Sequence, residues 1–150
     1  MLTYNKKVIL SIQPQGVWRY RDFVYLNDTN PVQAWYEGLP EDIRDTFDAL
    51  LKNNQKTERP QQWTGFRRYL HGGDLQKYGV WELEFKGDDR LAHRLMGVFS
   101  GQKTAIFLIG CYHKGGNYTP SDALITAANR AKWLAQKKAK TSERTVRTDI

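Results

Sequence analysis

Four side chains that could act together on a phosphodiester lie between residues 94 and 118 of this 150-residue chain. His113 and Lys114 follow an apolar run directly, and Tyr118 comes four residues after Lys114. Arg94 interrupts an earlier apolar stretch. Metal-free cleavage of RNA requires a base for the 2′-OH proton, cations for the crowded phosphorane and an acid for the departing 5′ oxygen. An imidazole, a phenol and two cations could supply these parts if their segments face one another.

Arg94 has two possible kinds of partner. A guanidinium on a sheet face either pairs with a carboxylate, here Glu82 or Glu84, or points at the phosphate of a ligand. The sequence slightly favours the ion pair and leaves both interpretations open.

Three short strands must position these residues. Residues 81–85 alternate between apolar and acidic side chains, which predicts a strand with one dry and one wet face. A turn at 87–89 leads to a second predicted strand over 91–99. Residues 105–109 are apolar throughout, as in a central strand that is buried on both faces. Residues 112–118 are then interpreted as a basic, glycine-containing loop, the kind of segment in which function often lies.

Helices and further strands are predicted before this segment. Asn30-Pro31 is a helix start, and Gly38 is expected to close that helix in a left-handed conformation. Pro40 begins a second helix, and the two helices form a hairpin that covers the sheet. Residues 6–12 and 17–26 are further candidate strands. The core-facing stripe of the second helix consists of Ile43, Phe47, Leu50 and Leu51.

A final helix is predicted after the loop. Thr119 is the expected N-cap and Pro120 the first helical residue, and the helix extends to about residue 140 with small apolar side chains on one face. Residues 141–150 lack apolar periodicity and are expected to be disordered. Residues 1–140 are thus predicted to form one domain.

The charge indicates a polyanionic partner. The chain has 23 Lys and Arg against 16 Asp and Glu, a formal net charge of +7 and a sequence pI of about 9.5. This excess favours nucleic acid or an acidic protein. Arg19 and Arg21 fit the solvated face of an edge strand better than an RNA contact, and Arg67 and Arg68 fit an exposed basic pair equally well. The candidate nucleic-acid contacts are Arg19, Arg21, Arg67, Arg68 and Lys77.

Several kinds of chemistry are disfavoured. The three His and one Cys have no metal-ligand spacing, and the chain has neither a phosphate-binding glycine fingerprint opening a helix nor a nucleophile elbow. We therefore expect neither a metal nor a cofactor. Cys111 ends an apolar run and is expected to be buried. No segment resembles a signal peptide or spans a membrane, so we expect a cytoplasmic protein without a membrane partner.

Six short motifs follow one another between residues 30 and 134. They are Asn30-Pro31-Val32, Gly38-Leu39-Pro40, Gly79-Val80-Trp81-Glu82-Leu83, His93-Arg94-Leu95, residues 110–114 and Tyr118-Thr119-Pro120. Their order and spacing resemble the RelE/HigB-like toxin family, specifically its phage-associated branch. The resemblance implies a RelE-like α+β fold, with a small antiparallel sheet packed with two N-terminal helices and a C-terminal helix.

The resemblance also carries site positions. The strand arginine of the family falls on Arg94, its basic pair after the last strand on His113 and Lys114, and its helix start on Thr119-Pro120. The chain departs from the family's pattern at one position: Glu84 stands where many members place a basic residue. Loss of that cation weakens phosphate binding.

The resemblance implies the toxin of a type II toxin–antitoxin pair. Such relatives are typically ribosome-dependent mRNA endonucleases, so the ribosome, mRNA and a small acidic antitoxin, often with a helix-turn-helix, are the expected partners. Two alternatives remain open. The same fold hosts gyrase-inhibiting toxins of the ParE type, and a homologue that has lost catalysis could simply bind nucleic acid or protein.

Overall fold

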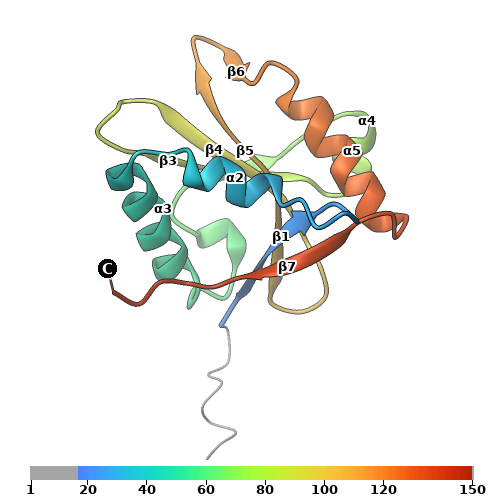
Figure 1. The fold of residues 1–150 in the computed structure, drawn as a ribbon, viewed down its shortest axis with the longest axis horizontal. Helices are drawn as coiled ribbons and strands as arrows, with labels where there is room; N and C mark the ends of the chain where they lie inside the picture. The colour runs from blue at the N-terminus through green and yellow to red at the C-terminus, as the bar shows by residue number, and fades with distance from the viewer. Residues whose placement is uncertain (1–16, 150) are drawn as a thin grey trace, which may run out of the picture.

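A seven-stranded sheet lies between two layers of helices in the computed structural model, which describes residues 17–149 (Figure 1). The strands are β1 Arg19–Val24, β2 Phe66–Tyr69, β3 Trp81–Lys86, β4 Ala92–Phe99, β5 Thr104–Lys114, β6 Asn117–Thr119 and β7 Lys140–Arg144; the helices are α2 Pro31–Glu37, α3 Glu41–Asn54, α4 Gly73–Lys77, α5 Ala123–Ala135 and the short 3-10 helix η1 Pro60–Gln62. The predicted α+β class is confirmed. The strand predicted at 6–12 lies outside the described residues.

The sheet is antiparallel except at one pair of strands. Its order is β2-β3-β4-β5-β1-β7, and β6 pairs with the end of β5. β1 runs parallel to β5, so the sheet departs from the expected antiparallel arrangement at this pair. Helices and three strands separate β1 from β5 in sequence, and no hairpin fixes their relative direction.

Helix α2 begins as predicted and ends differently. The Asn30 side chain accepts a hydrogen bond from the Gln33 backbone N–H at 2.9 Å, and proline occupies the first turn. Gly38 ends the helix with φ −81°, not in the expected left-handed conformation. Its N–H still bonds to the carbonyls of Ala34 and Trp35, which keeps the turn right-handed.

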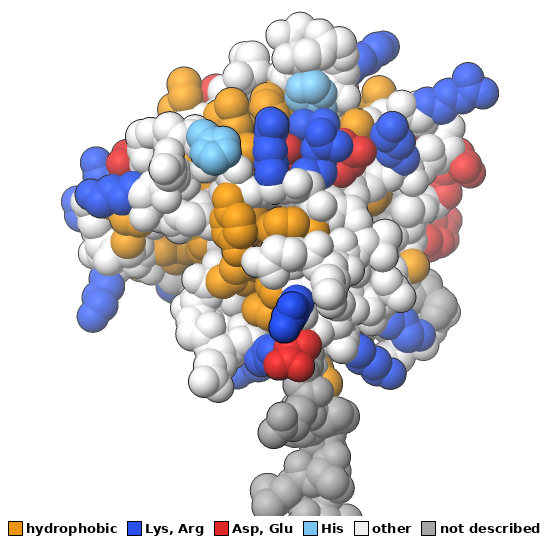
Figure 2. All heavy atoms as spheres, turned by 180° about the vertical axis from the view of Figure 1, so that it is seen from behind, with side chains coloured by type: hydrophobic (Ala, Val, Ile, Leu, Met, Phe, Trp, Pro, Cys, Tyr) orange, Lys and Arg blue, Asp and Glu red, His pale blue; other side chains and the backbone are white. Residues whose placement is uncertain are grey.

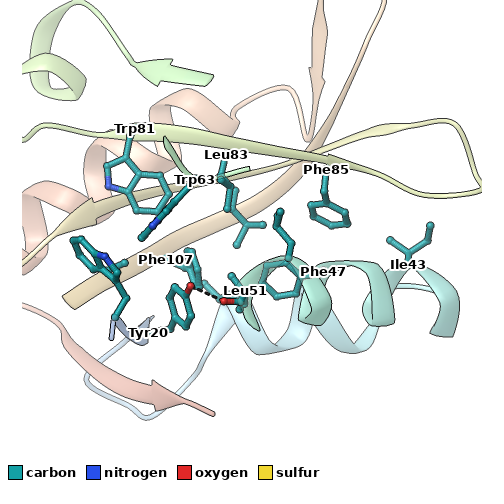
Figure 3. Packing of buried hydrophobic residues seen from close by; sticks show 14 residues of the cluster. Tyr20, Ile43, Phe47, Leu51, Trp63, Trp81, Leu83, Phe85 and Phe107 are labelled. Carbon is teal, nitrogen blue, oxygen red and sulfur yellow. Dashed lines mark hydrogen bonds between the residues drawn. The ribbon is translucent and has the colours of Figure 1, made fainter. Parts of the chain in front are cut away.

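An aromatic core fills the space between α3 and the sheet (Figure 3). The predicted stripe of α3 is buried, with Ile43 and Phe47 no more than 1% exposed. Phe47 lies against Phe85 and Phe107, at ring-centroid distances of 5.5 and 6.1 Å. Burying each such side chain contributes about 1.5–3 kcal/mol. This layer therefore fixes the positions of β3 and β5.

Small side chains let α5 pack on the opposite face of the sheet. Ala123, Ala127 and Ala131 are buried there in a second core. The helix starts three residues later than the predicted proline start and ends at Ala135, not near residue 140. The start shifts because Thr119 pairs with Tyr112 as the last residue of β6 and cannot cap a helix.

The predicted loop at 112–118 is a β-hairpin. Residues 112–114 continue β5, and Asn117–Thr119 return as β6. Gly115 and Gly116 form the turn with φ values of 58° and 85°, which glycine adopts without steric cost. The side chains of this segment are thus held by strand pairing.

A strand replaces the start of the tail that we expected to be disordered. Residues 140–144 form β7, which pairs with β1 along its whole length. Arg144 donates from Nε and Nη2 to the two carboxylate oxygens of Asp22, each at 2.8 Å, and both side chains are buried. The polar sequence of residues 140–144 does not indicate a strand. The ion pair that holds this strand in place joins Arg144 to Asp22, which is distant in the sequence.

Replacing Arg144 with alanine is expected to lower the free energy of unfolding by about 3 kcal/mol, because the buried Asp22 carboxylate loses its partner. Urea denaturation of the full chain measures this loss. The double replacement Arg144→Met with Asp22→Asn should recover part of it, since no charge then stays buried unpaired. A loss as small as that of an exposed pair, below about 1 kcal/mol, would contradict the proposed anchor.

Cys111 is buried, as predicted. Burial raises the pKa of its thiol to about 12. The folded protein should therefore hold roughly a thousandfold less thiolate at Cys111 than the unfolded chain. Alkylation at neutral pH, followed by mass spectrometry, is expected to be fast in denaturant and very slow in buffer. Equal rates would show that the thiol is open to solvent.

Candidate functional site

Strand register brings the charged residues of β3 and β4 onto one face of the sheet. Glu84 lies directly opposite Arg94, which lies opposite Cys111 of β5. Opposed residues of neighbouring strands project from the same face, and side chains alternate along each strand. Glu82, two residues before Glu84, therefore joins them. This is the face that α5 covers further along the sheet.

Arg94 is held by two carboxylates. Its Nε donates to Glu84 Oε1 at 3.0 Å, and its Nη2 forms an ion pair with the same oxygen at 2.9 Å. Its Nη1 donates to Glu82 Oε2 at 3.3 Å. Burial lowers the pKa of Arg94, but the charges of Glu82 and Glu84 outweigh burial and the pKa is raised. The ion pair favoured from the sequence is confirmed.

Tyr118 reaches the same carboxylate from β6. Its hydroxyl donates to Glu82 Oε2 at 2.5 Å and accepts from Arg94 Nη1 at 3.4 Å. Burial, followed by the hydrogen bond to Glu82, raises the pKa of the phenol. Tyr118 is thus a protonated donor of fixed orientation.

His113 and Lys114, at the end of β5, project from opposite faces of the sheet. The His113 ring meets the Tyr118 ring edge-on, with 4.8 Å between centroids, and is half-buried. Because His113 pairs with Tyr118 and side chains alternate, Lys114 projects from the opposite face. The structure brings Arg94, His113 and Tyr118 together and does not bring Lys114 to them.

A bulge in β2 adds two guanidinium groups. The pairing of β2 with β3 shifts register between Phe66 and Arg68, so that Arg67 is an extra residue. Two consecutive side chains thereby approach one carboxylate: Arg67 Nε lies 3.6 Å and Arg68 Nε 3.7 Å from Glu82 Oε1. Arg67 Nη1 also contacts Glu84 Oε1 at 3.3 Å.

We call this group the arginine–carboxylate cluster. Three guanidinium groups against two carboxylates leave one net positive charge. Figure 2 shows Lys and Arg side chains beside acidic ones on one side of the molecule, with one histidine to their left and another above them. The cluster combines exposed cations with a phenol held as a hydrogen-bond donor, and these groups suit a phosphodiester. Its members are Arg67, Arg68, Glu82, Glu84 and Arg94, with Tyr118 and His113 beside them.

The other predicted nucleic-acid contacts lie elsewhere. Lys77 is exposed on α4, with its amine over the Tyr78 ring. Arg21 donates to the side chain and carbonyl of Thr141, which ties β1 to β7. Arg19 lines a separate groove beside α3.

The bulge in β2 was not predicted from the sequence, although Gly65, just before it, is a signal of irregular backbone. A Cβ at this position would lie 2.2 Å from the carbonyl oxygen of Glu84, and Gly65 has φ +84°. Only glycine allows this approach, which lets the Glu84 N–H bond to the Gly65 carbonyl at 2.8 Å. A lone glycine before two arginines could have indicated an irregular strand.

The fold and cluster define a small α+β domain with exposed arginine side chains at one end of its sheet. A family model described as "Phage derived protein Gp49-like (DUF891)" matches residues 34–132. The chain belongs to this phage-derived family, which is related to the RelE/HigB toxins of toxin–antitoxin systems.

No curated protein and no solved structure matches the chain. Within residues 17–149, no helix has the length and apolar character needed to cross a membrane.

Arg94→Ala is expected to lower the free energy of unfolding by about 3 kcal/mol, because it leaves the fully buried Glu82 charge short of its nearest cation. Arg68→Ala is the matched control: it removes a more exposed guanidinium of the same cluster and should cost less than about 1 kcal/mol. Urea unfolding of both variants tests the difference. Equal losses in the free energy of unfolding would mean that Arg94 does not compensate the buried charge of Glu82.

Proposed function

We propose that the protein is the toxin of a type II toxin–antitoxin pair and that it cuts mRNA on the ribosome without a metal ion. Family membership supports the toxin role. The observation that carries the nuclease role is the convergence of His113, Tyr118 and Arg94 at one end of the sheet, beside Arg67 and Arg68.

The phosphate is bound by the exposed part of the cluster. Arg67 and Arg68 have 42% and 56% of their side chains exposed, and guanidinium groups suit the paired oxygens of a phosphodiester. Arg94 is almost fully buried and acts differently. It fixes Glu82 and Tyr118, and places its charge beneath the bound phosphate.

Proton transfer falls to His113 and Tyr118. His113 lies against Tyr118 and takes the 2′-OH proton, since imidazole is the side chain that most often acts as a general base. Tyr118 keeps its proton because its pKa is raised. When RNA is bound, its O–H releases the hydrogen bond to Glu82 and gives the proton to the departing 5′ oxygen. Glu82 holds the phenol in place from below. The roles thus differ from those expected from the sequence, because Lys114 takes no part in them.

The test is cleavage of mRNA by the purified protein with and without ribosomes. Cuts are expected only in the ribosome-containing reaction. Tyr118→Phe and His113→Ala should each slow cleavage by about 10²-fold or more, as expected for loss of an acid or a base. Primer extension on the mRNA reads both the position and the rate of cutting.

Tyr112→Phe is the matched control. It removes the hydroxyl of Tyr112, which precedes His113 in β5 and projects from the opposite face of the sheet. It should leave the rate of mRNA cleavage unchanged. Equal effects at Tyr112 and Tyr118 would contradict the assigned acid. Growth arrest accompanied by loss of DNA supercoiling and intact mRNA would replace the nuclease with a ParE-like inhibitor.

A further inference from the structure

One oxygen atom of Glu84 accepts contacts from two arginines. Nε and Nη2 of Arg94 lie 3.0 and 2.9 Å from Glu84 Oε1, and Nη1 of Arg67 lies 3.3 Å from the same atom. A non-bridging phosphate oxygen accepts charge-assisted hydrogen bonds from the same kinds of donor. Glu84 thus occupies donors that a bound phosphodiester would use.

Exposure separates Glu84 from the other carboxylate of the cluster. The side chain of Glu82 is 0% exposed, whereas that of Glu84 is 17% exposed and adjoins the 42% exposed Arg67. An anion that arrives from solvent therefore meets Arg67 and Glu84 before it meets Glu82. Displacing Glu84 returns a carboxylate to water, and displacing Glu82 would break the buried centre of the cluster.

We propose that Glu84 is an internal competitor for phosphate: an RNA phosphodiester gains the exposed guanidinium of Arg67 by displacing the Glu84 carboxylate. This inference rests on the RNA binding in the proposed function. It assigns Glu84 control over affinity for the RNA backbone and no part in proton transfer.

The charge of the cluster predicts that neutralising Glu84 strengthens RNA binding. Neutralising Glu84 raises the net charge of the five charged residues from one positive charge to two. Its backbone stays in place, because the Glu84 N–H bonds to the Gly65 carbonyl and β3 remains paired on both sides. The freed guanidinium of Arg67 is then available to the phosphate without displacement of a carboxylate.

The experiment titrates the full-length protein into a fluorescent single-stranded RNA with 2′-O-methyl groups, which lacks the hydroxyl needed for cleavage. Glu84→Gln is expected to bind this RNA about tenfold more tightly at low salt, as for one added charged hydrogen bond. The gain in affinity should shrink as the salt concentration rises, because it is electrostatic. Glu84→Thr, a second neutral side chain suited to a strand, should behave alike.

Glu58→Gln is the matched control. It changes the net charge of the protein by the same amount and removes the partner of Lys103, 3.7 Å away, in the turn at the opposite end of β4 from Arg94. It should leave the affinity for the uncleavable RNA unchanged. If Glu84→Gln binds no more tightly than Glu58→Gln, the inference is overturned.

A double variant tests whether the increase in RNA affinity comes from Arg67. Adding Arg67→Ala to Glu84→Gln should remove most of the increase in affinity, whereas a retained increase would overturn the role of the freed guanidinium. The nuclease and the competitor can fail separately. Tighter RNA binding by Glu84→Gln without ribosome-dependent cutting supports the competitor and refutes the nuclease. Cutting by the wild-type protein with no tightening by Glu84→Gln refutes the competitor alone.

Discussion

The buried charge of Glu82 is the constraint on which the functional end of the sheet depends. Its side chain has no exposed surface, and a carboxylate removed from water must be compensated by nearby charge and hydrogen bonds. Arg94 from β4, Tyr118 from β6, and Arg67 and Arg68 from β2 provide that compensation to a residue of β3. A single charge therefore joins four strands, and the same groups form the site.

Exposure rises outward through the cluster, and this order separates its structural members from its functional ones. Arg94 is buried and Tyr118 half-buried, and both are fixed by their shared partner, whereas Arg67 and Arg68 reach solvent. The helix layers give this arrangement a rigid base. Large aromatic side chains fill the α3 side, and small alanines bring α5 close on the other side. A rigid base allows proton donors and cations to be held in place before a ligand arrives.

The family match and the cluster occupy the same part of the sheet. The match runs from within α2 to within α5, so β1 and β7 lie outside it. These two strands stand at the edge of the sheet opposite β2 and are joined by the ion pair of Asp22 with Arg144. They enlarge the sheet without contributing to the cluster. The cations of β1 that suggested nucleic-acid contact belong to this added edge.

Local patterns in the sequence determined the α+β class, the starts of α2 and α3, the central strands and the burial of Cys111, because caps, periodicity and apolar runs act over a few residues. They also favoured the pairing of Arg94. Only the tertiary structure decided that Lys114 faces away from Arg94, since that depends on where β5 ends and β6 begins to pair. Only it revealed β7 as a strand, because its anchor joins residues 122 positions apart. A bulge, a hairpin register and a distant ion pair are set by contacts across the fold, and these contacts built the site.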